Sequence, residues 1–443
     1  MSDQDLKQAL LHLPENASEA IVNSVFISKL LLALGFEQAD QVPNFRTGLG
    51  SQSVDYAARK STENNQFIHT KTNPYLLIEA KARSINLCKN SSQYETTVQQ
   101  LKKYLLSPNC KSVCWGIISN SQQIQLFRKH NKVIYPATDC LKLNTNNVVD
   151  TVAKIHQQIE APEKALTVAI YNNKGGVGKT TTTANLAAVL TLSGKKVLVV
   201  DFDPNQQDLT HSLGIEVGQQ GFYACMENKR ANIDDQVIQH HTVSLKNRRF
   251  VIDVIPADQT FADKSENELR QELKVHRLRQ ILKPLKSRYD YILIDTPPNW
   301  RFVTTSAIYA ADVVLIPTKH NNIFSLKNAA TAIHKYIPEV QEYRKDGGPI
   351  ALPIFLNGEN ITDFQRTAAH KAIDKIILQA KREFNLLPYF YPRYTNAQKD
   401  RYIFDLPSYA RIANAAFEQI PAVYKNKTAR DYYLALAKEY FLQ

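Results

Sequence analysis

The sequence has little of what marks proteins outside the globular class. Among its 443 residues are only five cysteines, 14 glycines and 19 prolines, which excludes a disulfide scaffold and a collagen-like or low-complexity chain. No apolar run reaches the roughly 18 residues that span a bilayer. The first 30 residues carry four acidic residues and no small-residue cleavage pattern, so we expect no signal peptide. The odd cysteine count and the lack of zinc-ligand spacing predict a reduced, cytoplasmic protein.

The composition predicts a folded, basic protein of more than one domain. Hydrophobic residues make up 44% of the chain and charged residues 22%, and the length suggests two or three domains. The net charge of +12 favours polyanionic partners such as nucleic acid, nucleotides or anionic membrane. A mildly basic solvated surface explains the same charge equally well.

Hydrophobic periodicity predicts a small α/β domain over residues 1–160. Apolar residues recur at helical spacing from Ser18 to Gly35, and alternation or short apolar runs indicate strands further on. The predicted elements are helices Ser18–Gly35, Gln93–Leu106 and Asn146–Glu160 and strands Val54–Ala57, Tyr75–Ala80, Val113–Ile118 and Ile124–Phe127.

A second domain is predicted over residues 161–443, because Ala161-Pro162-Glu163 interrupts the chain and its rhythm then changes. Apolar strands at Leu166–Tyr171, Val197–Val200 and Tyr291–Ile294 alternate with helices to the end. This pattern predicts a doubly wound, mostly parallel sheet.

A glycine-rich loop, Asn172–Thr180, lies between the first of these strands and a helix. Its three glycines allow backbone N–H groups to converge on phosphates, and the helix start adds its positive dipole end. Lys179 supplies a charge for the β- and γ-phosphates, and Thr180 a hydroxyl for Mg²⁺. The loop departs from the ordinary P-loop in two ways: Asn173 replaces the first glycine, and Lys174 is an additional lysine.

Carboxylates end two of the apolar strands. Asp201 and Asp203 follow Val197–Val200, and Asp295 follows Tyr291–Ile294. Because the carboxyl ends of parallel strands meet in one crevice, these side chains are expected to hold Mg²⁺ and orient water.

Together the runs Lys174–Thr180, Asp201–Pro204 and Asp295–Pro298 closely resemble the ParA/MinD family of deviant-Walker ATPases. The resemblance extends over about residues 165–443. Other segments occur in the order that the family shows, namely Tyr289–Tyr291, Leu315–Pro317 and Tyr391–Arg393.

The resemblance implies an ATP-dependent homodimer that sandwiches two ATP molecules. Lys174 would reach the nucleotide of the partner subunit, Asp203 would position the attacking water, and Asp201 and Asp295 would belong to the magnesium shell with Thr180. The nucleotide-binding residues implied are Lys174, Gly175, Gly176, Val177, Gly178, Lys179, Thr180 and Thr181, with Asn357 and Pro392 near the adenine.

In this family, ParA proteins bind DNA without sequence preference and MinD proteins bind membrane through a C-terminal helix. Residues 428–443 interleave apolar and charged residues, which indicates a helix docked on its own domain and no membrane anchor. Residues 362–443 carry 13 basic and 8 acidic residues. By resemblance, Arg393 and Lys427 lie where the family contacts DNA. Each is equally compatible with a solvated surface charge. The resemblance also implies a ParB-like adaptor protein as partner and a nucleoid-associated location.

The N-terminal domain carries a second set of chemically reactive residues. Asp55 lies on a short strand, and a later strand ends in Glu79-Ala80-Lys81, which places Glu79 and Lys81 on one face. Two carboxylates can hold a divalent ion, and the lysine can position water near a phosphodiester. Gln100 and Tyr104 follow one helical turn apart.

This arrangement resembles the PD-(D/E)xK nuclease core, specifically the N-terminal nuclease domain of type I restriction motor subunits, over about residues 15–135. The resemblance implies a restriction-endonuclease-like fold, and Glu19 matches the family's first-helix glutamate. Asp55 departs from the pattern because Val54, and not proline, precedes it. Cleavage of DNA, binding without cleavage, and a purely structural domain all remain open.

Three functions follow from the two resemblances. The first is a ParA-like ATPase for plasmid or chromosome partition or cargo positioning, with a fused nuclease-like DNA-binding domain. The second is an ATP-gated DNA nuclease of a restriction or defence system. The third is a scaffold whose N-terminal domain binds a partner protein. A pair of adjacent histidines, His240-His241, is interpreted as two surface residues, because neighbours on a strand point to opposite faces and no third metal ligand is evident.

Overall fold

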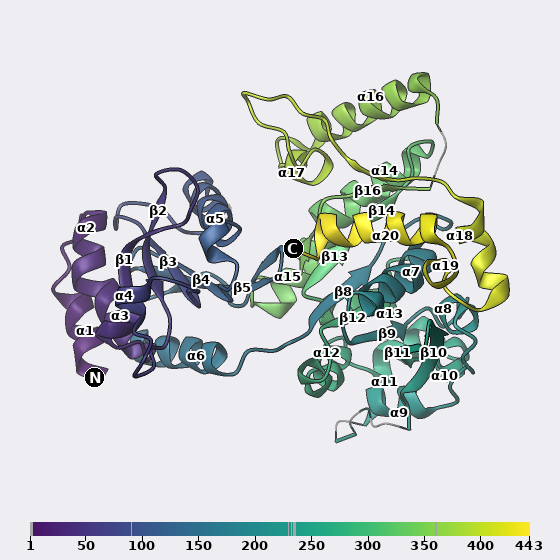
Figure 1. The fold of residues 1–443 in the computed structure, drawn as a ribbon, viewed down its shortest axis with the longest axis horizontal. Helices are drawn as coiled ribbons and strands as arrows, with labels where there is room; N and C mark the ends of the chain where they lie inside the picture. Colours follow the sequence, from purple (N-terminus) through teal and green to yellow (C-terminus); the bar gives the residue numbers. More distant parts are fainter. Residues whose placement is uncertain (1–2, 90, 229, 232, 234–235, 359–360) are drawn as a thin grey trace. The chain divides into compact units, whose positions relative to one another are not determined.

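The computed structural model describes residues 3–89, 91–228, 230–231, 233, 236–358 and 361–443 (Figure 1). The chain divides into two compact units. Unit 1 comprises residues 1–162 with 345–348 and 443, and unit 2 comprises residues 163–344 and 349–442. Each unit is described by itself.

Unit 1 contains a mixed sheet in the order β1-β2-β3-β4-β5-β6, with β7 paired to β5. All its neighbouring strands are antiparallel except β3 and β4, which are parallel and joined through helix α5. The strands are β1 (Gln41–Arg46), β2 (Ser53–Ala58), β3 (Leu76–Ala80), β4 (Trp115–Ser119), β5 (Gln123–His130), β6 (Val133–Pro136) and β7 (Leu141–Lys142).

Helices cover both faces of this sheet, because the side chains of the central strands alternate between two hydrophobic cores. Leu76 and Ile78 of β3 belong to the core that contains residues of α1, α2, α3 and α6. Leu77, between them, belongs to the core under α5. The helices are α1 (Asp3–Leu11), α2 (Glu19–Val22), the π-helical turn η1 (Asn23–Ile27), α3 (Ser28–Ala33), α4 (Phe67–Thr70), α5 (Ser92–Leu105) and α6 (Val148–Glu160), with short 3₁₀ turns at Gln38–Asp40 and Pro108–Cys110.

Unit 2 is built on the sheet β10-β11-β9-β12-β8-β13-β15, in which every pair is parallel except β10 and β11. A second, parallel sheet has the order β14-β16-β17. The prediction of a mostly parallel α/β sheet is confirmed. The strands are β8 (Leu166–Ile170), β9 (Val197–Asp201), β10 (Gln239–Leu245), β11 (Arg248–Ile255), β12 (Tyr291–Asp295), β13 (Val313–Leu315), β14 (Pro317–Thr318), β15 (Ile350–Ala351), β16 (Phe355–Asn357) and β17 (Phe404–Leu406).

Helix α7 (Lys179–Leu192) follows β8 and is almost wholly buried, since α20 (Lys427–Tyr440) packs along it (Figure 1). The expectation that the C-terminal helix docks on its own domain is confirmed. The other helices of unit 2 are α8 (Asp208–Ser212), α9 (Gly221–Glu227), α10 (Gln259–Ala262), α11 (Glu266–Glu272), α12 (Arg277–Leu282), α13 (Phe302–Ala310), α14 (Ile323–Thr331), α15 (Ile337–Arg344), α16 (Asp363–Ala380), α17 (Leu387–Phe390), α18 (Ala410–Asn414) and α19 (Ala422–Lys425). Short turns lie at Pro284–Ser287, Ala332–Tyr336 and Ala415–Glu418.

The prediction that His240 and His241 are both surface residues was wrong for His241. His240 is exposed on β10, but His241 is buried and its Nδ1 lies 2.8 Å from the backbone oxygen of Leu213. Burial lowers the pKa of His241. Within the described residues, no helix is both long and apolar enough to cross a membrane.

Candidate functional site

The glycine loop joins the end of β8 to the start of α7, and two of its glycines have conformations that other residues rarely adopt. Gly176 has φ 71° and Gly178, the residue that caps α7, has φ 84°. A Cβ atom on Gly178 would also lie 2.2 Å from the Nδ2 atom of Asn357. The positive φ therefore favours glycine at 178, and a larger residue would also have to displace the Asn357 amide.

Three asparagine side chains fix the loop by donating hydrogen bonds to backbone carbonyl oxygens, two of them within the loop and one in a neighbouring strand. Asn357 donates from Nδ2 to the carbonyl oxygen of Val177 (2.7 Å). Asn328 donates to the carbonyl oxygen of Asn173 (2.6 Å), and the fully buried Asn172 donates to that of Pro317 (2.9 Å). Because side-chain amides pin both ends of the loop, its N–H groups are held in place before any ligand arrives.

Lys179 lies at the start of α7 with 7% of its surface exposed. Its Nζ atom donates to the carbonyl oxygen of Lys174 across the loop (3.3 Å). Burial lowers the pKa of Lys179, while Asp295 and Asp203 raise it. The ammonium group is thus positioned over the loop and faces two carboxylates.

Asp295 ends β12 beside the loop and is bound by two hydroxyls of α7. Thr180 donates to Oδ2 (2.7 Å) and Thr183 to Oδ1 (3.3 Å). Burial and the neighbouring Asp201 raise the pKa of Asp295 to about 8. A buried carboxyl group near other carboxylates is stabilised when a cation shares the site.

Asp201 is the last residue of β9 and Asp203 lies two residues further on, and the two carboxylates differ in their surroundings. Thr210 donates to Oδ2 of Asp201 from its N–H (2.8 Å) and its hydroxyl (2.7 Å). Burial raises the pKa of Asp201 to about 6, against these hydrogen bonds. Asp203 accepts two backbone N–H groups at its Oδ1, both at 3.3 Å. Asp201 therefore anchors α8 as well as facing the site.

The donor set at this edge of the sheet fits Mg²⁺. The Thr180 hydroxyl and the Asp295 carboxylate are hard oxygen ligands, and the carboxylate lies in a position where burial disfavours its charge. Over the described ranges, no group of three or more His, Cys, Asp or Glu side chains has a metal-binding arrangement. A cation held here would therefore take further ligands from phosphate oxygens and water.

The remaining residues predicted for unit 2 lie in varied surroundings. Lys174 is half-buried and Gly175 exposed, and the carbonyl oxygen of Thr181 accepts from the Tyr433 hydroxyl (3.5 Å). Pro392 is exposed.

The two residues predicted to contact DNA differ in availability. Arg393 forms an ion pair with Glu439 (3.2 Å), and its guanidinium carbon lies 3.5 Å from the centre of the Tyr402 ring. Lys427 is exposed at the start of α20. Lys427 is the freer of these two cations, while Arg393 would have to exchange its carboxylate partner for a phosphate.

In unit 1, Asp55 and the end of β3 lie together. Asp55 accepts from the backbone N–H of Ala80 at Oδ2 (2.8 Å) and from the Asn23 amide at Oδ1 (2.9 Å). Since Ala80 directly follows Glu79, this hydrogen bond fixes the spacing of the two carboxylates.

Glu79 is 3% exposed and pairs through Oε1 with the Lys81 ammonium (2.5 Å). Lys81 also lies 3.5 Å from a carboxylate oxygen of Glu19. Burial raises the pKa of Glu79 to about 7; Lys81 opposes this shift, and Asp55 and Glu19 add to it. The structure thus brings together Asp55, Glu79, Lys81 and Glu19, four of the six residues that the sequence pattern singled out.

No prediction was made for Asn23 from the sequence. The sequence did predict that Gln100 and Tyr104 lie on one helix face, and the two side chains are hydrogen-bonded to each other. The Oδ1 atom of Asn23 is buried without a hydrogen-bond partner, beside Asp55, and suits a cation ligand. Its spacing of four residues from Glu19 on a helix would have revealed it. Gln100 donates to the Tyr104 hydroxyl (2.9 Å) on α5.

Comparisons with known proteins agree with the geometry of unit 2. Residues 165–347 match the family model described as "AAA domain". The sporulation initiation inhibitor protein Soj of Bacillus subtilis (strain 168) is 42% identical over 155 residues, which is 34% of this chain and 57% of that protein. The chromosome partitioning protein ParA of Myxococcus xanthus (strain DK1622) is 39% identical over 152 residues, 34% of this chain and 50% of that protein. The chain spans about half the length of these curated relatives.

The loop, Lys179 and the Thr180–Asp295 pair define residues 165–347 as a P-loop ATPase domain. These residues are similar to proteins of the ParA/MinD family. Among solved structures, the septum site-determining protein MinD complexed with Mg-ADP from Pyrococcus horikoshii aligns over 62% of this chain and 95% of that chain. The identity is 23% and the TM-score is 0.42. The PD-(D/E)xK resemblance of unit 1 stays a prediction.

Proposed function

We propose that the protein binds ATP with Mg²⁺ at the loop of unit 2 and hydrolyses it slowly. The observation that carries this proposal is the position of Lys179. Its ammonium group donates to the carbonyl oxygen of Lys174 across the glycine-rich loop, and Asn357 holds the same loop through the carbonyl oxygen of Val177. Thr180 and Asp295 would hold Mg²⁺, which supplies charge neutralisation for the phosphates. Asp203, fixed by two backbone N–H groups, would orient the attacking water.

We further propose that ATP drives formation of a homodimer in which Lys174 reaches the partner's nucleotide. Lys174 is half-buried, and its contact with Lys179 uses only the backbone carbonyl of Lys174. That contact therefore leaves the Lys174 side chain available to reach a partner subunit, which supports this role. Sedimentation velocity with ATP and Mg²⁺ tests it. Asp203→Ala is expected to accumulate as an ATP-bound dimer, whereas Lys174→Ala should bind ATP and sediment as a monomer. Equal sedimentation of both variants with and without ATP would contradict the dimer.

The dimer is proposed to bind DNA without sequence preference and to act in partition or cargo positioning, with a ParB-like adaptor as partner. The names of the relatives, a chromosome partitioning protein among them, and the basic C-terminal segment support this proposal. Two weak patches on one duplex gain from effective concentration, which would make DNA binding depend on ATP.

A second function, ATP-gated cleavage of DNA, is favoured by one specific arrangement in unit 1. The buried Glu79 faces a lysine and shares its surroundings with Asp55 and the unpartnered oxygen of Asn23. Divalent cations bound by two carboxylates and an amide oxygen are a common way to activate water at a phosphodiester.

Incubation of the full chain with supercoiled plasmid, ATP and Mn²⁺ tests this second function. Nicking is expected for the natural protein and should be lost in Glu79→Gln. If the natural protein leaves the plasmid intact but still binds DNA when ATP is omitted, unit 1 is a DNA-binding module. If it neither cuts nor binds, the proposal of a scaffold domain for a partner protein stands in its place.

A further inference from the structure

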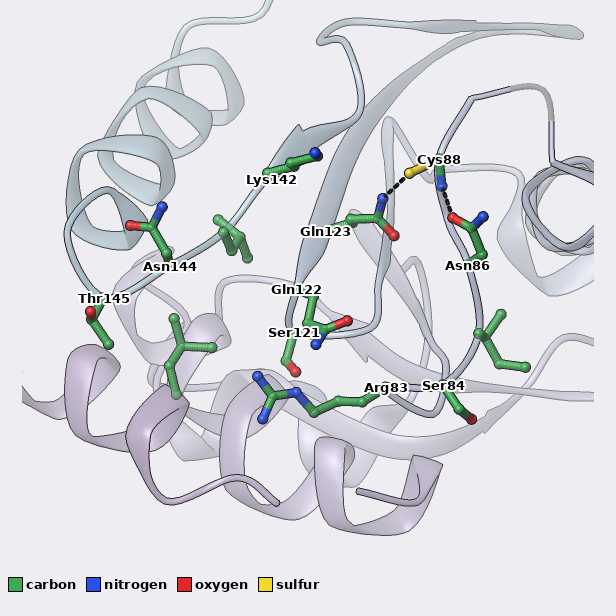
Figure 2. Close-up of a pocket in the computed structure, with 13 residues that line it drawn as sticks. Arg83, Ser84, Asn86, Cys88, Ser121, Gln122, Gln123, Lys142, Asn144 and Thr145 are labelled. Carbon is green, nitrogen blue, oxygen red and sulfur yellow. Dashed lines mark hydrogen bonds between the residues drawn. The ribbon is translucent and has the colours of Figure 1, made fainter. Parts of the chain in front are cut away.

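A pocket of about 670 Å³ lies in unit 1, apart from the Asp55–Glu79 cluster (Figure 2). It is lined by the segment after β3, by the turn between β4 and β5, and by the segment from β7 to α6. Its size falls in the range of ligand-binding cavities in proteins.

The pocket is positively charged and otherwise neutral. Arg83 and Lys142 line it, and no acidic residue is among its lining residues in the described part of the chain. Within that part neither cation has a carboxylate partner: Arg83 donates to the backbone oxygens of Leu13 (2.6 Å) and Pro14 (3.1 Å), and Lys142 is exposed. Two cations without counter-charges favour an anionic ligand.

Two buried polar atoms of the lining have no hydrogen-bond partner. Ser121 is 0% exposed, and its hydroxyl is unpartnered; so is Nε of Arg83. Figure 2 shows the Ser121 hydroxyl directed toward the Arg83 guanidinium at the wall of the pocket. Because buried polar groups in native proteins are almost always satisfied, unpaired donors beside a cation indicate a ligand that accepts hydrogen bonds.

The pocket adjoins the candidate nuclease cluster through the chain itself. Arg83 follows Lys81 by two residues, so their Cα atoms are at most about 7 Å apart. The backbone N–H of Lys81 donates to Ser119, and that of Arg83 donates to Ala17, two residues before Glu19. These backbone hydrogen bonds therefore connect the segment that lines the pocket to the segments that carry the Asp55–Glu79 cluster.

From these observations we infer that the pocket binds a phosphate ester, and that this phosphate belongs to the backbone of a nucleic acid strand. Amide and hydroxyl side chains make up much of the remaining lining, beside Cys88 and three aliphatic residues, and they suit phosphate and sugar oxygens. No aromatic side chain lines the pocket among the described residues, so nothing there stacks a free base. A strand that ran from Arg83 to Lys81 would bring a neighbouring phosphodiester to the Asp55–Glu79 cluster. This inference is independent of ATP hydrolysis and of cleavage.

The test measures binding of a fluorescein-labelled 12-nucleotide single strand to the full chain by fluorescence anisotropy. ATP is omitted to silence DNA binding by unit 2, and EDTA prevents cleavage. Lys142→Ala removes one pocket cation at an exposed site. Lys111→Ala removes a matched exposed lysine before β4, at the end of that strand opposite the pocket.

Lys142→Ala is expected to weaken binding about five- to tenfold and to lower the slope of log affinity against log salt by about 0.7, as one lost phosphate contact requires. Lys111→Ala should leave both unchanged. Ser121→Ala, which removes the buried hydroxyl, should also weaken binding. Equal affinities of Lys142→Ala and Lys111→Ala would overturn the inference. Displacement of the strand by a millimolar nucleoside monophosphate would overturn the strand assignment in favour of a free-nucleotide site.

Discussion

Replacement of Glu79 by Gln is expected to change how the stability of unit 1 depends on pH. The pKa of Glu79 is raised from 4.5 to about 7, mainly by burial. Between these two pH values the folded unit holds a proton that the unfolded chain has lost. Stability is therefore greatest below pH 4.5, falls as pH rises toward 7, and is constant above it as far as this group is concerned.

The size of the effect follows from the same shift. A difference of about 2.5 pKa units at roughly 1.36 kcal/mol each is about 3 kcal/mol, of which about 2–3 kcal/mol falls between pH 5 and pH 8. Glu79→Gln removes this term, so the variant should gain stability relative to the natural protein by that amount over this interval.

Urea unfolding at pH 5 and pH 8, without divalent metal, measures the effect. The two tryptophans are Trp115 in unit 1 and Trp300 in unit 2, so a Trp300→Phe background lets fluorescence report on unit 1 alone. Glu63→Gln, at an exposed glutamate, is the matched control. If Glu79→Gln and Glu63→Gln show the same pH dependence, Glu79 is not held in the surroundings described. Added Mn²⁺ should restore stability at pH 8 to the natural protein and not to Glu79→Gln.

Three further predictions concern unit 2. Gly178→Ala should abolish nucleotide binding, measured by calorimetry, because a Cβ atom would meet a side-chain nitrogen at 2.2 Å on a backbone with φ 84°; near-natural affinity would show that the loop yields freely. Thr210→Val should lower the stability of the unit by about 1.5–3 kcal/mol in denaturant titrations, because it removes a hydroxyl that binds the buried Asp201 at 2.7 Å; an unchanged midpoint would mean that water replaces it. Lys427→Ala should lower the salt slope of ATP-dependent duplex binding by about 0.9, and Arg393→Ala by less since that guanidinium is already paired; an equal or larger loss in Arg393→Ala would reverse this ranking.

The sequence predicted best those elements in which periodicity and burial agree. The apolar helix predicted from Ser18 to Gly35 exists as α2, η1 and α3, and the predicted strand Tyr75–Ala80 exists as β3. Strand β1 was missed because Pro43 and polar residues hide its alternation, although it pairs with β2 along its length. Short β6 and β7 have too few residues to show a period.

In the candidate sites, too, some contacts follow from the sequence pattern and others do not. Lys179 begins the helix that follows β8, and Asp295 ends the adjacent parallel strand β12, so the strand–loop–helix pattern brings them together. The contact of Asn357 with Val177 could not be predicted, because it joins residues 180 positions apart through a separate small sheet. Ser121 gave no signal either, since its importance rests on burial without a partner.

The central claim, that unit 2 binds ATP through Lys179, is tested most directly by calorimetric titration of ATP with Mg²⁺ into the natural protein and two variants. Lys179→Ala removes the ammonium that spans the loop. Lys283→Ala removes an exposed lysine that precedes β12, at the opposite end of the strands. The account predicts saturable binding by the natural protein and Lys283→Ala, and none by Lys179→Ala. Unchanged ATP affinity in Lys179→Ala would contradict it.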